Sequence, residues 1–201
     1  MIVFDSDNLS TFTRRKAPFI FLDTALPSRS NPYSYLFVSP RDILQTRRFD
    51  RVESILNKLD TLSKRYWIAG YLAYEAGYAL EDAPFQDIRT TVNPDSPLLW
   101  FGVFDTPFRY NHLRGKWSPS PPPEAASLRC DTQADQPAGR LKKTIDYKQY
   151  HHAVRTIQRL IQRGDTYQVN YTFDTRLSVT PDSPALYRTL RGKQRTPYCA
   201  Y

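Results

Sequence analysis

Hydrophobic and polar positions follow different periods along the chain, and each period predicts an element. Apolar residues recur at helical spacing from Val52 to Leu62 with charged residues between them, which predicts an amphipathic helix over residues 50–64. Short runs of β-branched and aromatic residues, bounded by turn residues, predict buried strands instead. These strands are Phe19–Leu22, Tyr33–Val38, Trp67–Leu72 and Leu98–Phe104.

Two further patterns in the first half concern turns and close packing. Strand-like residues at Phe108–Tyr110 and Lys116–Trp117 flank Asn111–Gly115, which predicts a hairpin loop. Gly70 and Gly77 lie among tyrosines, and glycine is the residue that lets neighbouring backbone approach closely. We therefore expect tight packing in this segment.

The second half of the chain begins with a helix whose two ends are marked in the sequence. Asp146 is a suitable N-cap, and Gly164 stands where a glycine commonly ends a helix. One face of this helix is apolar and the opposite face is basic. Three elements are predicted after it: a strand over 166–179, a short helix from Ser183 to Gly192, and the first half of a strand at 196–201.

A stretch poor in large apolar residues separates these two halves. Residues 118–139 are rich in proline, serine and alanine, which is typical of a linker or a long exposed loop. The sequence thus predicts an N-terminal region at 1–117, a linker or loop at 118–144, and the start of a second domain at 145–201.

Composition changes this picture mainly through charge. The 201 residues have a globular balance, with 40% hydrophobic and 24% charged residues, and a net charge of +8. Residues 1–139 hold 16 basic and 16 acidic residues, whereas 140–201 hold 12 basic and 4 acidic ones, so the whole excess lies in the last third. Such an excess serves solubility or attracts an anionic partner.

The location of the protein is predicted from what the chain lacks. Cys130 and Cys199 are too few and too far apart for a disulfide framework, which favours a reduced, cytoplasmic protein. We see no secretory signal at the start, and no apolar stretch approaches membrane-spanning length. No membrane partner is expected.

A direct search for reactive groups predicts no catalytic residue and no metal ligand. His151 and His152 are adjacent on a helix and point about 100° apart, which makes a poor chelate, and His112 lies in a hairpin loop.

The four basic residues from Arg188 to Arg195 raise the alternative of a nucleic-acid-binding protein. The neighbouring aromatic residues share one strand parity, as core residues would: Tyr167, Tyr171 and Phe173.

The most specific string in the chain follows the helix of the second half. It runs Gly-Asp-Thr-Tyr-Gln-Val-Asn from Gly164 to Asn170. This string resembles the G-D-x-Y-Q-V-N segment that opens the chorismate-binding domain of aminodeoxychorismate synthase component I, in the anthranilate synthase component I family. The related anthranilate enzymes usually have Q-V-V there, so Asn170 favours the aminodeoxychorismate branch. The family-motif residues are Gly164, Asp165, Tyr167, Gln168 and Asn170.

Further blocks resemble the same family in the same order, so the resemblance covers nearly all of residues 17–201. It implies an α+β fold with two packed antiparallel sheets and helices on the outside, incomplete in this chain. The blocks are Phe21–Thr24, Asn31–Ser34, Gly70–Glu75, Trp100–Asp105 and Thr196–Tyr201.

The resemblance also implies a function for the full-length family enzyme. That enzyme replaces the 4-hydroxyl group of chorismate with an amino group on the para-aminobenzoate route to folate. It uses Mg²⁺, and it takes ammonia from a glutamine amidotransferase subunit or domain. The family's P-I/A-K-G motif, whose lysine acts in the aminodeoxychorismate reaction, does not occur in these 201 residues. We therefore expect this chain to be the N-terminal portion, inactive by itself and holding no metal.

A regulatory pocket that binds L-tryptophan is the other feature implied by the resemblance. Matched residue by residue, it falls on Thr24, Tyr33, Pro197 and Tyr198. Thr24 stands where serine is common, and its added methyl group can crowd a ligand. Three alternatives to the aminodeoxychorismate prediction stay open: an anthranilate synthase component I-type enzyme of tryptophan synthesis, a non-catalytic tryptophan-binding module and, less favoured, a nucleic-acid-binding protein.

Overall fold

The computed structural model describes residues 17–81, 96–120, 141–178 and 183–201. By their contacts these residues form two compact units, which we describe separately. The first unit contains the described residues up to 120 together with 187–201, and the second contains those from 141 to 186. Most of the expected linker, 121–140, lies outside the described residues. The predicted boundaries after 117 and 144 stay a prediction.

A five-stranded antiparallel sheet forms one layer of the first unit. Its order is β10-β1-β2-β6-β7, so the last strand of the chain pairs with the first. The predicted strand at 33–38 and the predicted hairpin are confirmed, and the strand at 196–201 is present but shorter. The strands are β1 (Phe19–Asp23), β2 (Tyr33–Val38), β6 (Phe108–Asn111), β7 (Lys116–Ser118) and β10 (Cys199–Ala200).

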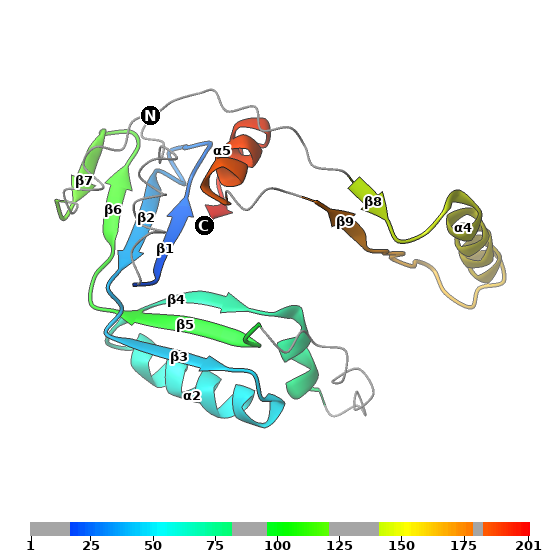
Figure 1. Cartoon of the computed structure of the whole chain (residues 1–201), viewed down its shortest axis with the longest axis horizontal. Coiled ribbons are helices and arrows are strands. Elements are labelled where there is room, and N and C mark those ends of the chain that lie inside the picture. The colour runs from blue at the N-terminus through cyan, green and yellow to red at the C-terminus, as the bar shows by residue number, and fades with distance from the viewer. Residues whose placement is uncertain (1–16, 82–95, 121–140, 179–182) are drawn as a thin grey trace. The chain divides into compact units, whose positions relative to one another are not determined.

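A three-stranded antiparallel sheet of order β3-β5-β4 forms the other layer, and the predicted amphipathic helix covers one of its faces (Figure 1). Strand β3 was not predicted, because Leu44 is its one buried residue and the strand therefore has no apolar run. The elements are β3 (Asp42–Thr46), η1 (Phe49–Arg51), α2 (Val52–Ser63), β4 (Trp67–Leu72), η2 (Tyr74–Ala79) and β5 (Leu99–Phe104).

Aromatic side chains join the two sheets. The ring centroid of Phe37 on β2 lies 5.1 Å from that of Phe104 on β5, and Ala69 of β4 completes this buried cluster. Next to it, the rings of Tyr35 and Trp67 are 6.4 Å apart. These contacts confirm the predicted α+β class with two packed antiparallel sheets and a helix outside.

The second unit is built around the predicted helix, now α4 (Tyr147–Gln162), with β8 (Leu141–Lys143) pairing β9 (Thr175–Leu177). Asp146 caps α4 as predicted, since its side chain accepts from the backbone N–H of Gln149 in a capping box. Gly164 ends the helix with a φ of 79°, and the N–H of Asp165 reaches the carbonyl of Leu160 at 3.0 Å. This is a Schellman motif, which favours glycine at that position.

The predicted strand over 166–179 is wrong for most of its length. Only β9 is extended and paired, and residues 165–174 have no regular structure. A strand needs a partner for its backbone hydrogen bonds, and among the described residues of this unit only the short β8 provides one. Tyr171 and Phe173 instead lie about 6 Å from the ring of Tyr150 on α4, and they are more than a third exposed rather than core residues. Tyr167 is 91% exposed.

The predicted short helix is α5 (Ser183–Lys193), whose residues from Tyr187 onward belong to the first unit. It does not end at Gly192, which lies inside it and is not among the residues of positive φ. None of the helices that the structure describes is both long and apolar enough to cross a membrane.

The close packing predicted for the glycines is present at Gly70 and not at Gly77. A methyl group at Gly70 would clash with the carbonyl oxygen of Trp100 and would lie 2.7 Å from the Cα of Phe101 on the neighbouring strand. At Gly77 nothing lies within 4 Å of such a methyl group.

We predict that Gly70→Ala lowers the free energy of unfolding by about 1–3 kcal/mol, because β5 backbone must shift to admit the methyl group. Gly77→Ala is the matched control and should stay within about 0.5 kcal/mol of the wild type. Urea unfolding of the two variants checks this. Equal stability of the two variants would contradict the proposed difference in packing.

Candidate functional site: a cavity between the two ends of the chain

One cavity in the first unit lies between strand β1, the start of β2 and the C-terminal segment. Its volume is about 450 Å³, within the range usual for small-molecule sites. Tyrosine rings, prolines and Leu22 give it apolar walls. Its lining comprises Leu22, Asp23, Thr24, Ser30, Asn31, Pro32, Tyr33, Tyr35, Pro197, Tyr198, Cys199 and Ala200.

The four residues assigned to a tryptophan-type pocket from the resemblance all line this cavity: Thr24, Tyr33, Pro197 and Tyr198. Thr24 joins the walls, since its hydroxyl lies 2.7 Å from the carbonyl oxygen of Tyr33 and 3.1 Å from that of Pro197. The single hydroxyl hydrogen is donated to these carbonyls. A ligand can therefore only donate to this oxygen, not accept from it.

Two tyrosines of the lining are held by neighbouring side chains. Tyr198 is 76% exposed, and its hydroxyl donates to Asn31 Oδ1 at 3.2 Å, which connects the C-terminal wall to the segment before β2. The guanidinium of Arg109 lies over the ring of Tyr33, 4.6 Å from the ring centroid. A cation over an aromatic face fixes the plane of the ring without using its hydroxyl.

A buried carboxylate lies beside the cavity. Asp23 belongs to the cavity lining next to Leu22, and its carboxylate is bonded to residues of β2 and α5 that do not line the cavity. Asp23 Oδ1 accepts from the hydroxyl of Ser34 at 2.9 Å, and Oδ2 accepts from the hydroxyl of Tyr187 at 3.1 Å. Arg191 on α5 completes the set.

Arg191 forms a two-pronged ion pair with Asp23. Its Nε donates to Asp23 Oδ2, and its Nη2 lies 3.4 Å from Oδ1. Both side chains are buried. Burial alone would lower the pKa of Arg191, but the hydrogen bond and the charge of Asp23 outweigh it, so the pKa is raised. Burial also raises the pKa of Tyr187, with the carboxylate as the second cause. Arg191 is therefore charged and Tyr187 neutral.

Sequence reasoning missed this network. Arg191 appeared there only as part of a basic cluster, and Asp23 only within the block Phe21–Thr24. A signal was available, because Tyr187 and Arg191 are four residues apart on a short helix and therefore share one face.

Ser34 extends the network to His112. The Ser34 oxygen accepts from the N–H of Thr24 at 3.0 Å and lies 2.7 Å from His112 Nε2. Because the serine gives its one hydrogen to Asp23, Nε2 of His112 carries the hydrogen of this contact. Burial lowers the pKa of His112, which favours the neutral ring. Nδ1 of His112 is then a bare acceptor, buried and without a hydrogen-bond partner among the residues that the structure describes.

The family-motif residues belong to the second unit and line no part of this cavity. Gly164 ends α4, Asp165 forms an ion pair with Arg163 at 3.2 Å, and Tyr167 projects into solvent. The side-chain amide of Gln168 lies 3.5 Å from Asn170 Oδ1.

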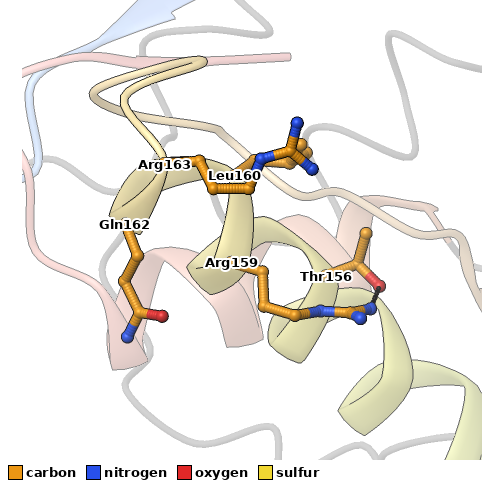
Figure 2. Close-up of a pocket in the computed structure, with 5 residues that line it drawn as sticks. All are labelled: Thr156, Arg159, Leu160, Gln162 and Arg163. Carbon is orange, nitrogen blue, oxygen red and sulfur yellow. Dashed lines mark hydrogen bonds between the residues drawn. The ribbon is translucent and has the colours of Figure 1, made fainter.

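A second, shallower hollow of about 360 Å³ runs along the last turns of α4. Figure 2 shows that its walls come from one helix and that Arg159 already donates to Thr156, at 3.1 Å. We assign it no ligand. In the described part of the chain, no three His, Cys, Asp or Glu side chains lie close enough to hold a metal ion.

Comparison with known proteins gives one family match. The sequence model of the family described as chorismate binding enzyme matches residues 20–201, which include both units. The chain therefore belongs to the chorismate-binding enzyme family. A search of curated proteins found no match to this sequence.

The neutral His112 makes stability depend on pH. Burial lowers the pKa of His112, the nearby Arg191 lowers it further, and Asp23 opposes both. The unfolded chain, with a histidine pKa of about 6.5, then binds more protons than the folded chain. Stability is therefore complete above that pH and decreases as the pH falls below it.

We predict that the urea midpoint of the wild type falls more between about pH 8 and about pH 5.5 than that of His112→Gln, whose amide can still donate to Ser34. Both proteins share every other titrating group, so the difference reports His112. Parallel pH profiles would contradict the buried, neutral state of this ring.

Proposed function

We propose that this protein is the N-terminal part of a chorismate-using enzyme of the aminodeoxychorismate synthase component I type. Family membership supports the chorismate part, and the Gly164–Asn170 string, with Asn170 in place of valine, supports the aminodeoxychorismate branch. The proposed reaction of the complete enzyme replaces the 4-hydroxyl group of chorismate with an amino group. Ammonia would come from a glutamine amidotransferase partner, and Mg²⁺ would be held by residues other than those described.

We also propose that the cavity between β1, the start of β2 and the C-terminal segment binds L-tryptophan as a regulatory ligand. The observation that carries this proposal is that Thr24, Tyr33, Pro197 and Tyr198 line one cavity. The tyrosine rings suit an apolar aromatic side chain. The carbonyl oxygens around Thr24, and the lone pairs of its hydroxyl, suit the ammonium group of an amino acid.

Calorimetry with L-tryptophan tests the cavity directly. We predict binding by the wild type and about tenfold weaker binding by Thr24→Val, because the isosteric valine removes the hydroxyl that connects the walls. Thr61→Val is the matched control. It removes an exposed hydroxyl that donates to the Asn57 carbonyl on α2, and it should bind like the wild type.

Two results would contradict the proposed ligand. One is no heat of binding with the folded wild type. The other is equal binding by Thr24→Val and Thr61→Val. L-Phenylalanine, added as a competitor, shows whether the cavity distinguishes indole from a single ring.

A turnover assay addresses the enzyme. With chorismate, Mg²⁺ and ammonium, we expect neither aminodeoxychorismate nor anthranilate from the 201-residue chain, because the P-I/A-K-G motif does not occur in it. Product formation would contradict this expectation, and the product would then decide between the aminodeoxychorismate and anthranilate alternatives. Binding of L-tryptophan without turnover is the result expected both of an inactive enzyme portion and of a non-catalytic binding module.

A further inference from the structure

The C-terminal wall of the cavity is attached to the rest of the first unit at two places. Its backbone pairs with β1, with the N–H of Tyr201 donating to the Phe21 carbonyl at 2.9 Å and the N–H of Leu26 donating to the Thr196 carbonyl at 3.0 Å. The wall is also attached through α5, the helix that precedes it in the chain, because Arg191 of α5 binds Asp23. Three residues, 194–196, separate the end of α5 from Pro197.

Strand β1 connects the cavity to a buried ion pair. Leu22 and Asp23 both line the cavity, and Asp23 binds Arg191, which does not line it. On β2, Ser34 binds Asp23 while its neighbours Tyr33 and Tyr35 line the cavity. The ion pair is therefore bonded to both strands that form the cavity.

We infer that Arg191 is a positioning residue for this cavity: by holding α5 to Asp23, it sets the place of the wall from Pro197 to Ala200 and thereby controls ligand affinity. The inference rests on the proposed function for the identity of the ligand. It goes beyond that proposal by giving a role to a residue that does not line the cavity.

The energetics of the pair make this control steep. When Arg191 leaves, Asp23 stays as a buried carboxylate without its counter-ion, which is strongly unfavourable. Intermediate positions of α5 are therefore disfavoured, and the wall is either held or released. Because coupling between two equilibria is reciprocal, ligand in the cavity must in turn hold α5 more firmly against β1.

The test uses the full chain and two substitutions of different severity. Arg191→Gln removes the charge, and Arg191→Lys keeps it while losing the two-pronged geometry. Two controls accompany them. Lys193→Gln removes an exposed charge from the same helix, and Leu59→Ala destabilises the buried cluster beneath α2 without touching the cavity.

Affinity for L-tryptophan is the first readout. We expect about tenfold weaker binding by Arg191→Gln, an intermediate loss for Arg191→Lys, and values within about twofold of the wild type for both controls. A purely stabilising role of Arg191 would make Leu59→Ala behave like Arg191→Gln. Should Arg191→Gln give no folded protein, Arg191→Lys carries the comparison.

Amide hydrogen exchange without ligand is the second readout, and it does not depend on L-tryptophan. We expect peptides covering 196–201 to exchange about tenfold faster in the Arg191 variants and unchanged in both controls. If the wild type binds L-tryptophan and both Arg191 variants bind it with the same affinity, the inference is overturned. Absence of wild-type binding would overturn the proposed ligand instead, and unchanged exchange at 196–201 would then overturn the role of Arg191.

Discussion

The first unit depends on a buried ion pair that joins Asp23, near the start of the described chain, to Arg191, near its end. Moving two charges out of water is costly, and the cost is offset only if the remaining polar atoms are satisfied. Here Ser34 and Tyr187 supply two further hydrogen bonds to the carboxylate, and Ser34 is itself bonded to Thr24 and His112. The network thereby specifies which strand, helix and loop meet beside the cavity.

Apolar patterns predicted well the elements that are buried in a regular way. The strand Tyr33–Val38 and the strand Trp67–Leu72 were predicted with the bounds that the structure has, and the ends of α4 follow from Asp146 and Gly164. These signals are local: a cap or an apolar run reports its own conformation. Strand β3 has one buried residue and gave no such signal, so its pairing with β5 decides its conformation.

The segment 166–174 shows the opposite error. Its alternating sequence satisfies the requirement for a strand, yet a strand forms only where a neighbour accepts and donates its backbone hydrogen bonds. In the second unit that neighbour is β8, which reaches only Thr175–Leu177. Alternation in a sequence is thus a condition for a strand and not a sufficient one.

The residues of the candidate site also differ in whether the sequence predicts them. Thr24, Tyr33, Pro197 and Tyr198 could be named from short motifs, and the structure brings them together around one cavity. Arg191 could not be assigned, because its partner lies 168 residues away and a charged residue on a short helix is more often solvated.

This changes the meaning of the net charge of +8, which lies entirely in residues 140–201. Arg191 faces inward and is neutralised by Asp23, and Arg163 is paired with Asp165. Arg191, a central member of the basic cluster from Arg188 to Arg195, is therefore not part of an exposed basic patch. An anion-binding surface needs cations that share an exposed face, so the charge excess of this region is weaker support for a nucleic-acid partner than its arithmetic suggests.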